Sequence, residues 1–121
     1  MIALAGLFCW IVLAGTSHGA TVDCSTSSIQ TAVNAATSGT TIFVTGTCSQ
    51  TVAVREEKKE ITLDGQGTTI INGPLSTSTI FDLRGRSITL TGFTINGGRY
   101  GVLIRGGGSA VVDGNLIQNT A

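Results

Sequence analysis

Two pairs of charged residues recur along this 121-residue chain, and all four residues precede a glycine. Paired carboxylates supply the acid and the base of glycoside cleavage. Guanidinium groups bind carboxylates through two parallel hydrogen bonds. These residue types therefore indicate a candidate carbohydrate-binding site for acidic sugars, formed by Arg84, Arg105, Asp64 and Asp113.

Each pair also has a structural interpretation. In a stack of coils Asp64 and Asp113 would lie about 9 to 10 Å apart, with Thr91 between them, a separation that suits an inverting hydrolase. An aspartate before glycine is, however, typical of a turn. The two arginines would lie about 5 Å apart and repel each other unless an anion lies between them. They would otherwise extend into solvent, with Asp82 and Asp113 as partial partners.

A repeat of about 20 to 25 residues must position these side chains, because that period with short β-branched runs is typical of a solenoid. The segment 88–97 recurs at 110–119, and the segment 81–85 recurs at 102–106. An earlier copy of the first segment begins at Ile61 and matches once an insertion of about three residues is allowed. Apolar residues alternate within the runs, as in strands, and 12 of the 17 glycines follow residue 60. The pattern predicts an all-β fold, a right-handed parallel β-helix.

Three runs per repeat predict a coil with three sides, and residues 60–121 provide about two to three coils. The runs are 60–64, 69–72 and 79–84, then 87–91, 93–96 and 101–105, then 109–113 and 115–119. Like residues should stack inward from coil to coil, about 4.8 Å apart. The predicted inward columns are Ile61/Ile88/Ala110, Leu63/Leu90/Val112, Ile71/Ile95/Ile117, Phe81/Val102 and Leu83/Ile104.

The segment before the coils is predicted to cap the stack. Residues 27–36 form the one helix-like stretch, with Ser27 and Gln30 as a capping box and Gly39 ending it. Residues 41–44 and 51–54 are predicted strands of an incomplete first coil. The predicted cap spans residues 21–59, and its short amino-terminal helix would cover the open end that every solenoid must hide. Residues 55–60 are predicted to be an exposed turn.

Residues 1–20 contain an uncharged apolar stretch followed by small residues, which predicts a signal peptide and therefore a secreted or cell-surface protein. A membrane anchor is the alternative, although the stretch is shorter than the roughly 20 residues that cross a bilayer. Cleavage would remove Cys9 and the only histidine, His18, and leave Cys24 and Cys48. An even number of cysteines in an exported chain suggests a disulfide, with two unpaired thiols as the alternative. The net charge of zero argues against nucleic-acid binding.

Residues 28–36, 44–48 and 61–67 and the repeats up to Asn119 resemble the amino-terminal part of secreted right-handed parallel β-helix proteins of the pectate-lyase-like superfamily. The resemblance implies a ladder of stacked amides at Asn72, Asn96 and Gln118. It also implies polysaccharide as the partner, with cleavage by a lyase or a glycoside hydrolase in a full-length enzyme. A non-enzymatic surface or adhesin-type β-helix is the alternative.

The residues themselves leave the enzymatic class open. We expect no catalytic residue, no metal site and no cofactor in this chain, and the resemblance implies calcium only for a full-length lyase. The chain stops within the third coil, so we expect an amino-terminal fragment that self-associates through its uncapped end and, after signal cleavage, has no membrane segment.

Overall fold

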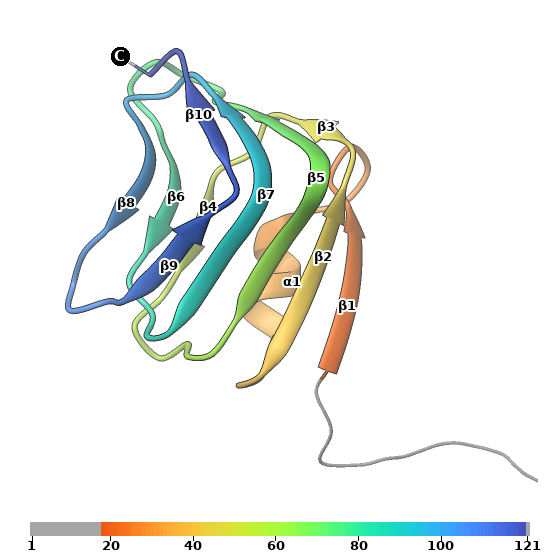
Figure 1. Ribbon diagram of the computed structural model, residues 1–121, viewed down its shortest axis with the longest axis vertical. Coiled ribbons are helices and arrows are strands. Elements are labelled where there is room, and N and C mark those ends of the chain that lie inside the picture. Colours follow the sequence, from red (N-terminus) through yellow and green to blue (C-terminus); the bar gives the residue numbers. More distant parts are fainter. Residues whose placement is uncertain (1–17, 121) are drawn as a thin grey trace, which may run out of the picture.

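The alternating runs form strands that stack in parallel, and the computed structural model, which describes residues 18–120, is a parallel β-solenoid of about five turns (Figure 1). The predicted all-β, β-helix fold is therefore confirmed. The elements are β1 (His18–Asp23), α1 (Ile29–Ala35), β2 (Thr40–Thr45), β3 (Thr47–Cys48), β4 (Val52–Val54), β5 (Thr62–Asn72), β6 (Thr79–Leu83), β7 (Ile88–Asn96), β8 (Tyr100–Ile104), β9 (Ala110–Asp113) and β10 (Leu116–Gln118).

The strands form two walls of the solenoid. The larger sheet has the order β1-β2-β5-β7-β10, with β3 also paired to β5 and β9 to β7, and the smaller sheet has the order β4-β6-β8. Every pairing between these strands is parallel. Figure 1 shows the long strands β5 and β7 curving around the side of the stack.

The predicted inward columns are confirmed. Leu90 of β7 pairs with Leu63 on one side and Val112 on the other. The remaining register pairs that match the prediction are Ile71 with Ile95, Ile95 with Ile117, Phe81 with Val102, Leu83 with Ile104 and Ile88 with Ala110. The two walls meet in the core, where the rings of Phe81 and Phe93 lie 5.2 Å apart between centroids. A one-residue shift would have turned the buried members of these columns to the surface.

The coils differ from the prediction in one respect, because the first two runs of the first two predicted coils join into single bent strands, β5 and β7. The bend requires glycine: Gly92 has φ +78°, and a Cβ added to Gly65 would lie 2.6 Å from the Gly92 carbonyl oxygen. The predicted insertion is also present, since the segment from Asp64 to Thr69 lies opposite the shorter segment from Thr91 to Phe93.

The stack continues further toward the amino terminus than the coils counted from residue 60. The predicted strands 41–44 and 51–54 of an incomplete first coil are confirmed as β2 and β4, which pair with β5 and β6. Strand β1, which was not predicted, pairs with β2 and adds one further layer to the large sheet. Helix α1 packs against β1, β2 and β4 and buries Ile29 and Val33. The helix therefore closes the core at this end, as predicted.

The predicted capping box is wrong in detail. The N-cap is Ser28, whose hydroxyl accepts a hydrogen bond from the Thr31 amide, and the helix ends at Ala35, before Gly39. Gln30 does not return to the cap, because its amide pairs with the backbone of Ala53. The side chain of Gln30 thus bonds to the edge of strand β4 instead of capping its own helix.

A disulfide joins Cys24, which follows β1, to Cys48 at the end of β3, with 5.7 Å between the Cα atoms. Residues 1–17 of the predicted signal peptide lie outside the described residues, and residues 18–20 begin β1. Among residues 18–120, no helix has the length and apolar character needed to cross a membrane.

Candidate functional site

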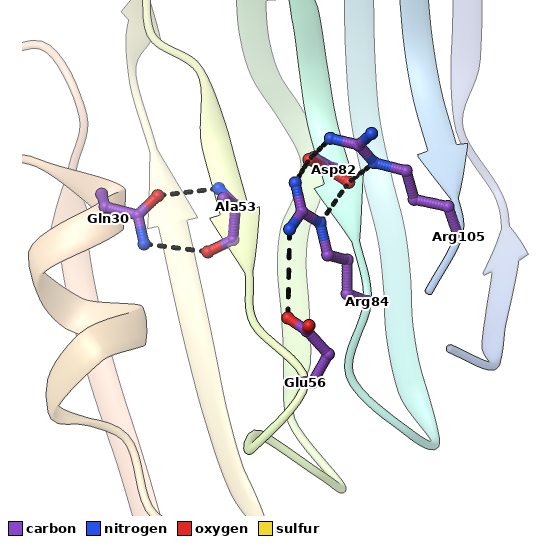
Figure 2. A network of polar contacts seen from close by, with 6 residues as sticks. All are labelled: Gln30, Ala53, Glu56, Asp82, Arg84 and Arg105. Carbon is purple, nitrogen blue, oxygen red and sulfur yellow. Dashed lines mark hydrogen bonds and ion pairs between the residues drawn. The ribbon is translucent and has the colours of Figure 1, made fainter. Parts of the chain in front are cut away.

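Asp82 is the centre of the most extensive charged network of the described residues (Figure 2). Its carboxylate accepts hydrogen bonds from Nε and Nη2 of Arg105, at 3.1 and 2.8 Å, and from the same atoms of Arg84, at 3.5 and 3.0 Å. Glu56 lies 4.0 Å from Nη1 of Arg84. The predicted arginine column is therefore present, and an intervening carboxylate relieves its repulsion.

Burial and charge act in opposite directions on Asp82, whose side chain is only 13% exposed. The hydrogen bond from Arg105 is the largest influence and lowers the pKa of the Asp82 carboxyl below its ordinary value. Burial raises this pKa, and the hydrogen bond and charge of Arg84 lower it further. The net result is a carboxylate that stays ionised and holds two guanidinium groups side by side.

The sheet register adds a third arginine to this column. Val54 pairs with Leu83, and Leu83 pairs with Ile104, so the residues that follow them, Arg55, Arg84 and Arg105, lie on three successive turns. The backbone bonds from Arg84 to the Val54 carbonyl and from Arg105 to the Leu83 carbonyl continue this register. Successive arginines are thus offset by one strand spacing, about 4.8 Å.

Sequence reasoning missed Arg55, although a signal was present. Residues 52–55, 81–84 and 102–105 share one pattern: apolar, any residue, apolar, arginine. The first copy lies before the recognised repeats and is followed by the charged segment 56–60, which concealed it.

The free edge of strand β4 is covered by side chains of helix α1. Gln30 donates from Nε2 to the carbonyl of Ala53 at 2.9 Å and accepts at Oε1 from the Ala53 amide at 2.7 Å (Figure 2). It also donates to Oδ1 of Asn34 at 3.0 Å. Gln30 therefore replaces the neighbouring strand that β4 lacks on this side and satisfies its backbone.

A hollow of about 270 Å³ lies between α1 and the end of β4, lined by Gln30, Asn34, Ala53, Val54, Arg55 and Arg84. Lys58 donates from Nζ to the carbonyls of Asn34 and Ala36, at 3.0 and 2.8 Å, at the carboxyl end of α1. The arginine column and this hollow form one continuous surface, because Arg84 belongs to both.

The predicted aspartates lie elsewhere. Asp64 and Asp113 pair on either side of Thr91, as predicted, but on the outer surface of the large sheet, whereas the arginines belong to the small sheet. The carboxylate of Asp64 accepts a bond from the Gln66 amide at 2.8 Å, which is a turn role. Asp113 is therefore not a partner of the arginines, and the four predicted site residues do not form a single site.

The predicted amide ladder is present at the corner after β5 and β7. Asn96 donates from Nδ2 to Oδ1 of Asn72 at 3.1 Å, and Gln118 donates from Nε2 to Oδ1 of Asn96 at 2.6 Å. The ladder ties three successive turns together through side chains. Between residues 18 and 120, no cluster of three or more His, Cys, Asp or Glu side chains is placed to bind a metal ion.

No protein-family model matches the chain, and no curated protein or solved structure matches it. The structure places the chain in the class of parallel β-solenoid proteins, in the β-helix form. The side chains beside the small sheet and the resemblance of the repeats are therefore the features that bear on function.

Proposed function

We propose that the chain is the amino-terminal part of a secreted β-helix protein of the pectate-lyase-like superfamily and that it binds acidic polysaccharide without cleaving it. The observation that carries the proposal is the column of Arg55, Arg84 and Arg105, which lie on three successive turns of the solenoid. A polyuronate carries one carboxylate per sugar, so its charges recur regularly along the polymer, as the guanidinium groups do along the stack.

The contacts of the column leave an excess of cations. The column consists of Arg55, Arg84 and Arg105, and two carboxylates, Asp82 and Glu56, lie within ion-pair distance of it among the described residues. Asp82 uses one edge of each guanidinium, and each keeps further N–H groups for a ligand. Arginine groups whose geometry is already held lose less entropy when they bind a carboxylate.

The proposal that the protein is secreted is supported by the apolar segment at residues 2–15 and by the disulfide, since disulfides persist in oxidising compartments. The carbohydrate partner is supported by the arginine column and by the resemblance of the repeats.

The test is binding of the purified chain to polygalacturonate, with the fully methyl-esterified polymer as the uncharged control. We expect binding that weakens with salt, and a loss of about tenfold or more in Arg105→Gln, since a charge-assisted hydrogen bond contributes about 1.5 to 3 kcal/mol. Arg99→Gln is the matched control, because Arg99 is exposed, carries the same charge and precedes β8, whereas Arg105 follows it.

Equal losses in both variants, or equal binding of the two polymers, would contradict the proposal. An intact protein that binds no polyuronate would favour the non-enzymatic surface class. Incubation with polygalacturonate, with and without calcium, should release no unsaturated or reducing ends. Cleavage that Asp64→Asn or Asp113→Asn abolishes would instead locate an active site on the large sheet.

A further inference from the structure

The hollow between α1 and β4 is lined by the exposed residues Arg55 and Asn34 and by the half-buried Gln30. All polar atoms of the Gln30 side chain are engaged, with Ala53 and with Asn34. Gln30 is therefore held in place and has little to offer a ligand. Helix α1 rather than a further strand lies beside β4, and Figure 2 shows Gln30 of this helix bonded to the backbone of Ala53.

Two groups around this hollow retain donors. Among residues 18–120, no carboxylate forms an ion pair with Arg55, which is exposed. Asn34 uses its Oδ1 to accept from Gln30, so its Nδ2 keeps two N–H groups. Arg84 lines the same space with a guanidinium that Asp82 already orients. A planar ligand with two acceptor oxygens would satisfy both sets of donors.

We propose that this hollow is a carboxylate-binding subsite in which Arg55 supplies the charge and Asn34 a second donor, so that one uronate carboxylate of the polysaccharide is held at the α1 end of the arginine column. This inference rests on the proposed function and deepens it. The hollow is slightly smaller than the roughly 300 to 1,000 Å³ of pockets for drug-sized ligands. Its size fits one charged sugar unit rather than an oligomer.

Glu56 is an exposed carboxylate that competes with a ligand for Arg84, because it lies 4.0 Å from Nη1 of that residue, whereas Asp82 holds the other edge of the guanidinium. Replacing Glu56 with glutamine removes a competing carboxylate without shortening the side chain. The structure therefore predicts that Glu56→Gln strengthens binding of a uronate, in contrast to the loss expected for Arg55→Gln.

The experiment measures the affinity for trigalacturonate and for galacturonate by calorimetry and follows the side-chain ¹⁵N signals of Asn34 and Arg55 by NMR. We expect about a tenfold loss for Arg55→Gln, as for a charge-assisted bidentate contact. For Arg99→Gln we expect less than a twofold change, and for Glu56→Gln a gain. Thermal melts of the variants establish that each one is folded. The affinities for methyl galacturonate and for inorganic sulfate are measured in the same way. If the subsite recognises a carboxylate, galacturonate binds more tightly than either of them.

Loss of trigalacturonate affinity to the same degree in Arg55→Gln and Arg99→Gln, or Asn34 signals that do not shift, would overturn the subsite. Polymer binding that still depends on Arg105 would in that case leave the proposed function standing. Conversely, galacturonate could shift the Asn34 signals while Arg105→Gln binds the polymer as tightly as the wild type does. That result would retain the subsite and contradict the proposed function. Sulfate binding as tightly as galacturonate would overturn the assignment to a carboxylate.

Discussion

Among the titratable side chains of the described residues, Asp82 is the one that is buried and also forms ion pairs with two arginines. Two guanidinium groups on neighbouring turns share its carboxylate, and through them β6 is tied to the residue that follows β8. The same contact that prepares a binding surface thus also joins two turns of the stack. Removing one partner of such a network leaves the others without their compensating charge.

Asp82→Asn should therefore reduce the free energy of unfolding at neutral pH by about 1 to 3 kcal/mol. The pKa of Asp82 is lowered in the folded protein, so its contribution is present above the ordinary aspartate pKa of about 3.9 and is lost as the pH falls through the folded pKa. Denaturant melts between neutral pH and about pH 3 should show the wild type converging on the variant. A difference that stays constant with pH would mean that the ionised carboxylate is not what stabilises the fold.

At the scale of the elements, strand β7 is the central test of the register. Leu90 is fully buried between Leu63 and Val112, whereas its neighbour Thr89 faces outward and is half-buried. Leu90→Ala should reduce the free energy of unfolding by about 2 to 5 kcal/mol, because it removes contacts and leaves a cavity. Thr89→Ala should cost far less. Equal losses in denaturant melts, or the reverse order, would show that the strand is shifted by one residue.

The disulfide is the second constraint at this scale, since it connects the segment after β1 to the end of β3 and encloses α1. Peptide mapping of exported protein without reductant should recover Cys24 and Cys48 in one linked peptide pair. Reduction should cost about 3 kcal/mol of stability under the chain-entropy estimate for a loop of this length. Free alkylation of both thiols in native, unreduced protein would contradict the pairing.

At the scale of the whole molecule, the two ends of the solenoid differ. Helix α1 covers the core beside β1 and β2, whereas β8, β9 and β10 form the last turn of the described residues and pair on one side only. Apolar side chains are exposed on this turn, including Val112 and Ile117 of the inward columns at 37% and 42%. Unpaired strand edges with exposed apolar residues are templates for association.

We therefore expect the 121-residue chain to self-associate through this turn. Light scattering at several concentrations should show a mass that rises with concentration. Leu116 and Ile117 are exposed on this edge. The double substitution Leu116→Lys and Ile117→Lys should restore a monomer, because charges on an edge oppose strand pairing. A wild-type chain that stays monomeric and melts cooperatively would mean that the outer edge of β9 and β10 is not a site of association.

The stack follows from patterns in the sequence, because alternation fixes which side chains face inward and the repeat fixes which residues lie on one another. These two patterns predicted the inward columns and the arginine column, whereas the amide ladder was implied by the resemblance to β-helix proteins. What lies beside each column depends on the tertiary structure. Asp82 bonds to both Arg84 and Arg105, and Arg55 lies in register with them. Gln30 bonds to the edge of β4 rather than to the amino end of its own helix. These contacts depend on the path of the chain at the corners and on which of several competing hydrogen bonds forms in the folded protein. The repeat period of the sequence specifies neither.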